Sequence, residues 1–187
     1  PFVTLITAFA NLFGLGGAPL CAMARGKGNR EGAQGIMVNA GFMLLLSGAV
    51  LTVLGIAFHR PLLYLFGASE VTYPYASSYI VIYLLGTLCV MLSLGLNPYI
   101  NCQGFARTGM LTVALGAAAN IVLDPIFIFA LHLGVRGAAI ATVLSQFLSA
   151  AWVVKFLTGK KAELKLDFRG FRPNWHCIQR ITVLGIA

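Results

Sequence analysis

Asp124 is the only acidic residue within a hydrophobic span of this 187-residue sequence. It lies in residues 111–130, a stretch in which nearly every other side chain is apolar or small. A carboxylate at that depth in a bilayer costs about 3 kcal/mol on the mildest scales. Such residues usually face a bundle interior or a water-filled cavity. Asp124 is therefore predicted to mark an ion or substrate pathway.

Two further polar residues are expected beside this carboxylate. Asn120 precedes Asp124 by four residues, which places both on one helical face. Thr142 falls at a similar depth on the next predicted helix, because only a short outer turn joins the two helices. The oxygen atoms of the three side chains suit a hard cation such as Na⁺. A carboxylate held away from water can instead alternate between its protonated and charged forms. The sequence thus predicts a coupling site for H⁺ or Na⁺.

Pro125 directly follows the carboxylate. Proline removes a backbone N–H donor and clashes with the preceding helical turn, so Pro125 is the predicted bending point of this helix. The alternative is that Asp124 only partners backbone groups that Pro125 loosens. A serine or an asparagine would fill that structural role without the cost of a charge.

Two other polar residues are weaker candidates for the wall of a substrate cavity. Gln146 lies one helical turn deeper than Thr142, and Asn97 lies near the cytoplasmic end of the third predicted span. Hydrogen bonding between helices is an equally good interpretation of Asn97.

The composition sets the fold class. The chain is 59% hydrophobic and 10% charged, whereas a typical soluble domain is about 25% charged. Several apolar stretches of about 20 residues predict membrane-spanning helices, and hence an all-α polytopic bundle. The five complete spans are expected at residues 2–24, 36–58, 75–98, 110–131 and 137–157, and a further span begins at Cys177.

The fifth predicted span also carries a stripe of small residues at intervals of four. Such stripes let neighbouring helices approach closely in lipid. The stripe consists of Gly137, Ala141, Ser145 and Ser149.

The basic residues predict the orientation in the membrane. Eleven of the thirteen Lys and Arg residues lie in alternate loops on one side, and only Arg60 and Arg136 lie on the other. The positive-inside rule places the basic side in the cytoplasm. The net charge of +8 therefore reflects topology, and no soluble basic face is present to bind nucleic acid.

Catalytic and metal-binding patterns are not found in the sequence. It has no HExxH-type pattern, no nucleophile–base pair and no cluster of metal ligands, so we expect neither an enzyme nor a cofactor other than the coupling ion. A single carboxylate also gives no ring of charge of the kind that lines a channel.

The ends of the chain suggest an internal piece of a longer protein. Pro1 opens directly into a hydrophobic span without the features of a signal peptide. The final apolar run stops before it could cross a membrane. The expected organisation is five spans in residues 1–157, a basic cytoplasmic connector in 158–176 and the start of another span in 177–187.

Several of these segments resemble the MATE family of multidrug and toxin extrusion transporters. The resemblance rests on Asn120-Ile-Val-Leu-Asp124-Pro125, on the glycine- and alanine-rich run that leads to Thr142, and on the Gly14-Leu-Gly16-Gly17-Ala18 pattern. It covers essentially the whole chain, from the second helix to the start of the seventh in a fold with twelve helices in two lobes.

The resemblance implies secondary active efflux across the cell membrane, in which organic cations leave while H⁺ or Na⁺ enters. It assigns the cation site to Asn120, Asp124 and Thr142, together with an aspartate on a preceding first helix. It also implies that membrane lipid, that first helix and a C-terminal lobe are the partners of this chain. The alternative within the same superfamily is a flippase for lipid-linked oligosaccharides. Such a flippase is expected to have an Arg-lined cavity, and the predicted spans contain no Lys or Arg in their interiors.

Overall fold

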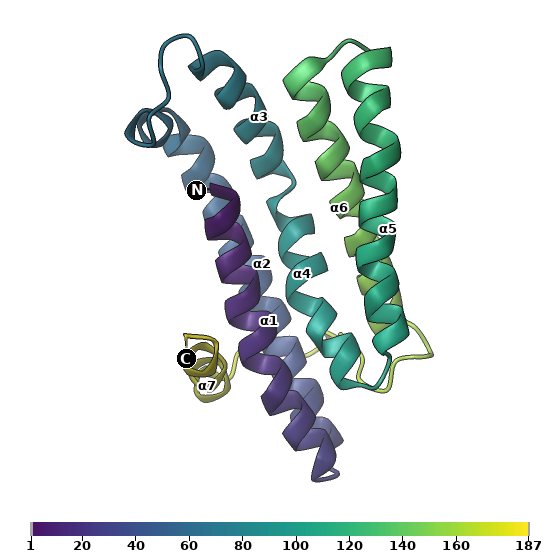
Figure 1. Ribbon diagram of the computed structural model, residues 1–187. Helices are drawn as coiled ribbons and strands as arrows, with labels where there is room; N and C mark the ends of the chain where they lie inside the picture. The colour runs from purple at the N-terminus through teal and green to yellow at the C-terminus, as the bar shows by residue number, and fades with distance from the viewer. Residues whose placement is uncertain (1, 187) are drawn as a thin grey trace.

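The computed structural model describes residues 2–186, and this part of the chain is helical without a β-strand. The prediction of an all-α bundle is confirmed. α1 runs antiparallel to α2 and α5 runs antiparallel to α6, and the bent path of α3 and α4 lies between these two pairs, as Figure 1 shows. The helices are α1 (Phe2–Gly26), α2 (Arg30–Leu65), α3 (Tyr73–Leu85), α4 (Thr87–Cys102), α5 (Ala106–Pro125), the π-helical turn η1 (Ile126–Ala130), α6 (Gly134–Thr158) and α7 (Trp175–Ile186).

Within residues 2–186, four helical segments are long and apolar enough to cross a membrane. They are α1, α2, α5 continued by η1, and α6, and the count becomes five if the bent pair α3 and α4 forms one span. The sequence placed these segments well, although α2 extends beyond the predicted 36–58 at both ends. The loop between α1 and α2, the α4–α5 turn and the connector after α6 meet at one end of the bundle, which we call the connector end (Figure 1). The predicted cytoplasmic loops therefore share one side.

The third predicted span is not one helix. The chain bends by 55° between α3 and α4, at Gly86, so the span predicted at 75–98 consists of two helices joined at a bend. Glycine is a poor helix former, and here it also allows a close approach. A Cβ atom at Gly86 would lie 2.6 Å from Cγ2 of Val143 on α6. The bend lets α3 and α4 each pack against α6.

The backbones of α1 and α4 come into close contact where the two helices cross. A Cβ atom at Gly14 would lie 2.7 Å from the carbonyl oxygen of Gly95, so the two backbones meet without intervening side chains. Tyr99 is fully buried beside this crossing and donates a 2.7 Å hydrogen bond to the carbonyl oxygen of Phe13. This contact satisfies a buried hydroxyl, as buried polar groups require.

The connector after α6 packs against the end of the bundle. Leu164 and Leu166 are buried, whereas their neighbours Glu163 and Lys165 are exposed. The backbone N–H of Leu164 donates to Oε1 of the buried Gln103 at 2.9 Å, and that of Leu166 donates to the carbonyl oxygen of Leu157 at the same distance. The connector is thus an ordered strap and not a free loop.

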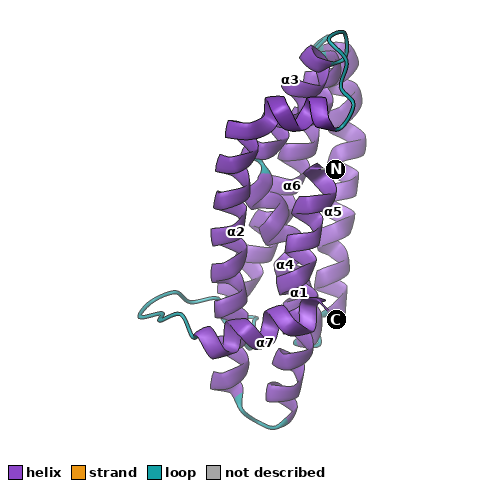
Figure 2. Cartoon of the chain, turned by 90° about the vertical axis from the view of Figure 1, so that its left-hand side faces the viewer, coloured by secondary structure: helices purple, strands orange, loops and turns teal. Residues whose placement is uncertain are grey.

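α7 begins at Trp175, two residues before the predicted start at Cys177. It lies across α1 and α2 near the connector end, as Figure 2 shows. Two glycines permit this crossing: a Cβ atom at Gly16 would overlap the backbone of Ile181, and one at Gly185 would overlap the backbone of Leu12. Whether α7 begins a further span stays a prediction.

Candidate functional site: a polar cavity beside Asp124

A cavity of about 350 Å³ lies between α4, α5 and α6. It is lined by four of the residues that the sequence indicates: two candidates for the coupling site and two candidates for the substrate cavity. They are Asn97, Asn120, Thr142 and Gln146. Three consecutive helices therefore bring these side chains to one place, as expected if neighbouring helices run antiparallel.

Asp124 lies next to this cavity, although it is not among the residues that line it. Its side chain is half-buried, and its Oδ1 accepts a 3.4 Å hydrogen bond from Nδ2 of Asn120. This bond uses the side-chain nitrogen atom of Asn120 as its donor. The carbonyl oxygen of the same side chain is left as an acceptor or a cation ligand, and Asn120 links the carboxylate to the cavity.

Thr142 orients its hydroxyl group along its own helix. Oγ1 donates a 2.9 Å hydrogen bond to the carbonyl oxygen of Ala138. The hydroxyl proton of Thr142 is therefore already engaged. The lone pairs of the oxygen remain to accept a hydrogen bond or to coordinate a cation. Asn120 and Thr142 thus each offer an oxygen atom to one cavity, and Asp124 adds a carboxylate beside it.

Gln146 and Asn97 differ in whether their side-chain oxygen atoms have a hydrogen-bond partner. Oε1 of Gln146 accepts a 2.7 Å hydrogen bond from Oγ of Ser93, which ties α6 to α4. Oδ1 of Asn97 is buried and has no hydrogen-bond partner within residues 2–186. An unpartnered buried acceptor costs stability, so Asn97 has free capacity for a donor group that enters the cavity. The interpretation of Asn97 as an interhelical hydrogen-bonding residue finds no support at this atom.

The backbone changes its hydrogen-bonding pattern immediately after Asp124. α5 ends at Pro125, and η1 begins at the next residue. The N–H of Leu131 then donates to the carbonyl oxygen of Ile126 at 2.9 Å, a spacing of five residues. Single π-helical turns are rare overall, but those that occur are often at functional sites. The structure thus places a helical irregularity at the predicted bending point, and bending itself stays a prediction.

The small-residue stripe on α6 is buried along its length, as expected. A Cβ atom at Gly137 would lie 2.6 Å from the carbonyl oxygen of Phe127, and one at Gly116 would lie 2.5 Å from Oγ of Ser149. Ser149 also donates a 3.0 Å hydrogen bond to the carbonyl oxygen of Thr112. Close contact between α5 and α6 fixes the relative positions of Asn120 and Thr142.

Sequence reasoning missed part of the cavity wall. Ser93 and Thr112 were not singled out, and Ser145 and Ser149 were assigned to packing alone, yet all four line the cavity. Ser93 precedes Asn97 by four residues, so the helical spacing of these two polar residues on one face was an available signal.

Comparison with known proteins gives a consistent result. The MatE family model matches residues 1–126. The multidrug export protein MepA of Staphylococcus haemolyticus (strain JCSC1435) is 28% identical over 186 residues, which cover 100% of this chain and 41% of the relative. An FAD transporter of Shewanella oneidensis (strain MR-1) is 29% identical over 189 residues, which cover 97% of this chain and 42% of that protein.

Solved structures agree with the sequence relatives. The inward-facing conformation of a multidrug resistance MATE family transporter of the MOP superfamily superposes with a TM-score of 0.91 at 29% identity. The match covers 97% of this chain and 41% of that structure. The chain spans about two fifths of the length of the curated relatives that it matches.

Proposed function

Because this chain belongs to the MatE family of multi-pass membrane transporters, we propose that it forms the N-terminal lobe of an antiporter. This antiporter would export organic cations across the cell membrane in exchange for H⁺ or Na⁺. One observation carries the proposal: the half-buried carboxylate of Asp124 is hydrogen-bonded to Asn120, which lines a polar cavity together with Thr142.

The charge of the site favours a cationic substrate. Asp124 is the only acidic residue of α4, α5, η1 and α6. No basic side chain lines the cavity among the described residues. An organic cation therefore finds an attractive charge beside uncharged hydrogen-bonding groups. An anionic substrate, such as the pyrophosphate group of a lipid-linked oligosaccharide, would face an unfavourable charge.

Exchange follows from competition for one carboxylate. In the proposed cycle, Asp124 compensates either the bound organic cation or the coupling ion, and binding of one releases the other. The side-chain oxygens of Asn120 and Thr142 suit a hard cation as ligands. The change from α-helical to π-helical bonding after Pro125 provides a segment that can adjust when Asp124 changes its charge state.

The test uses the full-length transporter that contains this chain, reconstituted into vesicles. Export of a cationic dye is followed under an imposed pH gradient, an imposed Na⁺ gradient, or neither. The expected result is export that requires one of the two gradients and is inhibited by other organic cations. Dye export of equal rate without either gradient would reject antiport.

Flavin adenine dinucleotide serves as the contrasting substrate in the same vesicles, since one relative is described as an FAD transporter. The charge of the cavity predicts that this anionic dinucleotide neither moves nor competes with the dye. Gradient-driven movement of the dinucleotide would reject the organic-cation assignment and leave the family assignment intact.

A further inference from the structure

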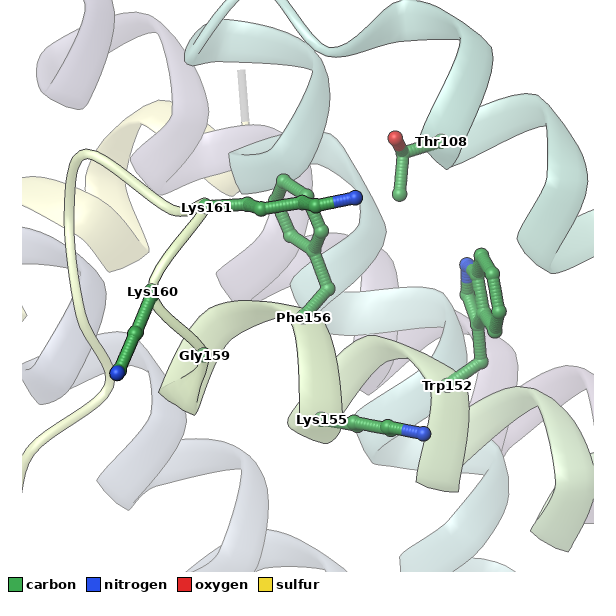
Figure 3. Close-up of a pocket in the computed structure, with 7 residues that line it drawn as sticks. All are labelled: Thr108, Trp152, Lys155, Phe156, Gly159, Lys160 and Lys161. Atoms are coloured by element: carbon green, nitrogen blue, oxygen red, sulfur yellow. The ribbon is translucent and has the colours of Figure 1, made fainter.

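A second cavity, of about 340 Å³, lies at the connector end, between the start of α5 and the end of α6. It is separate from the candidate transport site, because the two cavities share no lining residue. Its wall combines a tryptophan, a phenylalanine, a threonine and three lysines, and none of its lining residues is acidic. Figure 3 shows Trp152, Phe156 and Thr108 around it together with the lysines.

The lysines of this wall are not equivalent in position. Lys155 follows Trp152 by three residues on α6, so the two side chains share a helical face. Lys161 extends past the ring of Phe156 toward Thr108, whereas the ammonium group of Lys160 points away from Thr108 and Trp152 (Figure 3). In this view the ammonium group of Lys161 lies toward Thr108, that of Lys155 lies toward Trp152, and that of Lys160 is directed elsewhere.

The indole group of Trp152 supplies an independent observation. Its Nε1 atom is buried and has no hydrogen-bond partner in the described part of the chain. A buried indole N–H usually finds an acceptor. Thr108 lies in the first turn of α5, whose N-terminal amide groups receive no side-chain cap from Phe105, and free helix N-termini favour anions. Lysine ammonium groups and the indole group of Trp152 therefore belong to the residues that line one small space.

We propose that this cavity binds the phosphate group of an anionic lipid head group, with Lys155 and Lys161 as charge partners and Trp152 as a hydrogen-bond donor. The site lies at the end of a membrane span, on the side that the basic loops predict to be cytoplasmic. Tryptophan is enriched at this depth, and the anionic lipids of the cytoplasmic leaflet attract basic residues there. The ring of Phe156 provides apolar surface next to the phosphate position, which a lipid can use and a free phosphate cannot.

A simpler explanation is that the lysines only stabilise the C-terminus of α6 and obey the positive-inside rule. That explanation makes Lys160 as important as Lys155 and Lys161, and gives the indole N–H of Trp152 no role. The two explanations therefore predict different effects for substitutions of equal charge.

Delipidated full-length transporter is titrated with phosphatidylglycerol, and the first bound lipid is quantified by native mass spectrometry. The double variant Lys155→Gln, Lys161→Gln is expected to weaken its binding about tenfold. Trp152→Phe keeps an aromatic ring but removes the N–H, and is expected to weaken binding about threefold. The control pair Lys160→Gln, Lys165→Gln removes the same charge and is expected to leave binding within about twofold of the original.

Two further arms identify the source of the phosphate. Phosphatidylcholine carries a phosphate but no net charge, and inorganic phosphate carries charge but no lipid, so neither is expected to displace phosphatidylglycerol. Equal weakening by both double variants would overturn the proposal in favour of a general surface potential. Displacement by inorganic phosphate would overturn the lipid as the ligand, and displacement by phosphatidylcholine would overturn recognition of the anion. Melting temperatures of the variants are compared first, so that a loss of folding is not counted as a loss of binding.

Discussion

Nδ2 of Asn120 donates a 3.4 Å hydrogen bond to Oδ1 of Asp124, one turn further along α5. Since Asn120 lines the polar cavity and Asp124 does not, this bond connects the charge to the space in which a substrate or a coupling ion would sit. The strength of this hydrogen bond depends on the charge of Asp124, because hydrogen bonds to an ionised acceptor are roughly twice as strong as those between neutral groups.

Asp124→Asn is expected to abolish gradient-driven efflux of a cationic dye. The amide keeps the size of the side chain and its ability to accept a hydrogen bond, but it can neither bind a proton nor balance a cation. Efflux from cells is measured together with the amount of transporter in the membrane fraction. Asp167→Asn is the matched control, since Asp167 is exposed in the connector and only accepts a local hydrogen bond from the N–H of Arg169. Efflux that survives in the Asp124 variant would contradict the coupling role.

Thr142→Val is expected to lower the apparent affinity for the coupling ion several-fold, whereas Thr142→Ser is expected to retain it. Valine preserves the branched shape but removes the oxygen atom that faces the cavity. The dependence of efflux on external Na⁺ or on pH gives this affinity. Thr158→Val is the control, because Thr158 also donates to a carbonyl oxygen of its own helix, at 2.7 Å to Val154, but lies outside the cavity. A similar change in both valine variants would show that the helix, not the cavity, was affected.

The apolar pattern predicts where the helices lie, because lipid exposure demands long uninterrupted apolar runs. α1 begins at the predicted residue, and α6 differs from its predicted bounds by only a few residues. The bend at Gly86 was not predictable in this way, since a single glycine within an apolar run barely changes the hydropathy. Its effect depends on Val143, which approaches from α6, a helix distant in sequence.

The residues of the candidate site also differ in whether a local sequence pattern predicts their position. Helical spacing and one short turn, which are local properties of the sequence, predict that Asn120, Asp124 and Thr142 converge; Asn120 and Thr142 line one cavity, and Asp124 contacts Asn120 beside it. The spacing of Ser93 and Asn97 places both on one face of α4, but the hydrogen bond of Ser93 to Gln146 depends on how α4 is inclined toward α6 after the bend, and no local pattern contains that angle. The basic residues of the connector predict only that it is cytoplasmic. The alternation of Ala162, Leu164 and Leu166 with charged residues also predicts an extended segment with one buried side.

Gly14→Ala is expected to destabilise the transporter by about 1–3 kcal/mol, the usual range for forced overpacking. The added methyl group would meet the backbone of Gly95, which cannot rotate away as a side chain can. The melting temperature in detergent is the measurement. Gly35→Ala is the control, because its Cβ atom would meet no atom within 4 Å and alanine favours the helix. An unchanged melting temperature of the Gly14 variant would show that α1 and α4 can separate at low cost.

Gln103→Ala is expected to loosen the connector strap. Gln103 is 2% exposed, and its loss leaves the buried N–H of Leu164 without its acceptor, which costs about 1–3 kcal/mol. Lys160, Lys161 and Lys165 should then become faster sites of cleavage by trypsin. Gln179→Ala, an exposed position on α7, should leave the cleavage rate unchanged. An equal rate in both variants would contradict an ordered strap.

The ion pair between Arg25 and Glu163 contributes much less to this strap. Their side chains are 35% and 50% exposed, and the nitrogen–oxygen distance is 2.7 Å. Exposed pairs stabilise by about 0–1 kcal/mol. Arg30 also contacts Glu163, but through the backbone oxygen, which survives a change of side chain. Glu163→Gln is therefore expected to change trypsin cleavage far less than Gln103→Ala, and the reverse order would show that charge, not burial, holds the connector.

Pro125→Ala tests whether the irregular helix beside Asp124 takes part in transport. Alanine restores a backbone N–H at this position and removes the clash of the proline ring with the preceding turn. The helix should become more regular, so we expect an equal or higher melting temperature together with a lower maximal rate of efflux. Pro61→Ala is the control, because Pro61 also lies inside a helix, but on α2 and away from the polar cavity. A Pro125 variant that is more stable and equally fast would show that Asp124 can change its charge without any bending of α5.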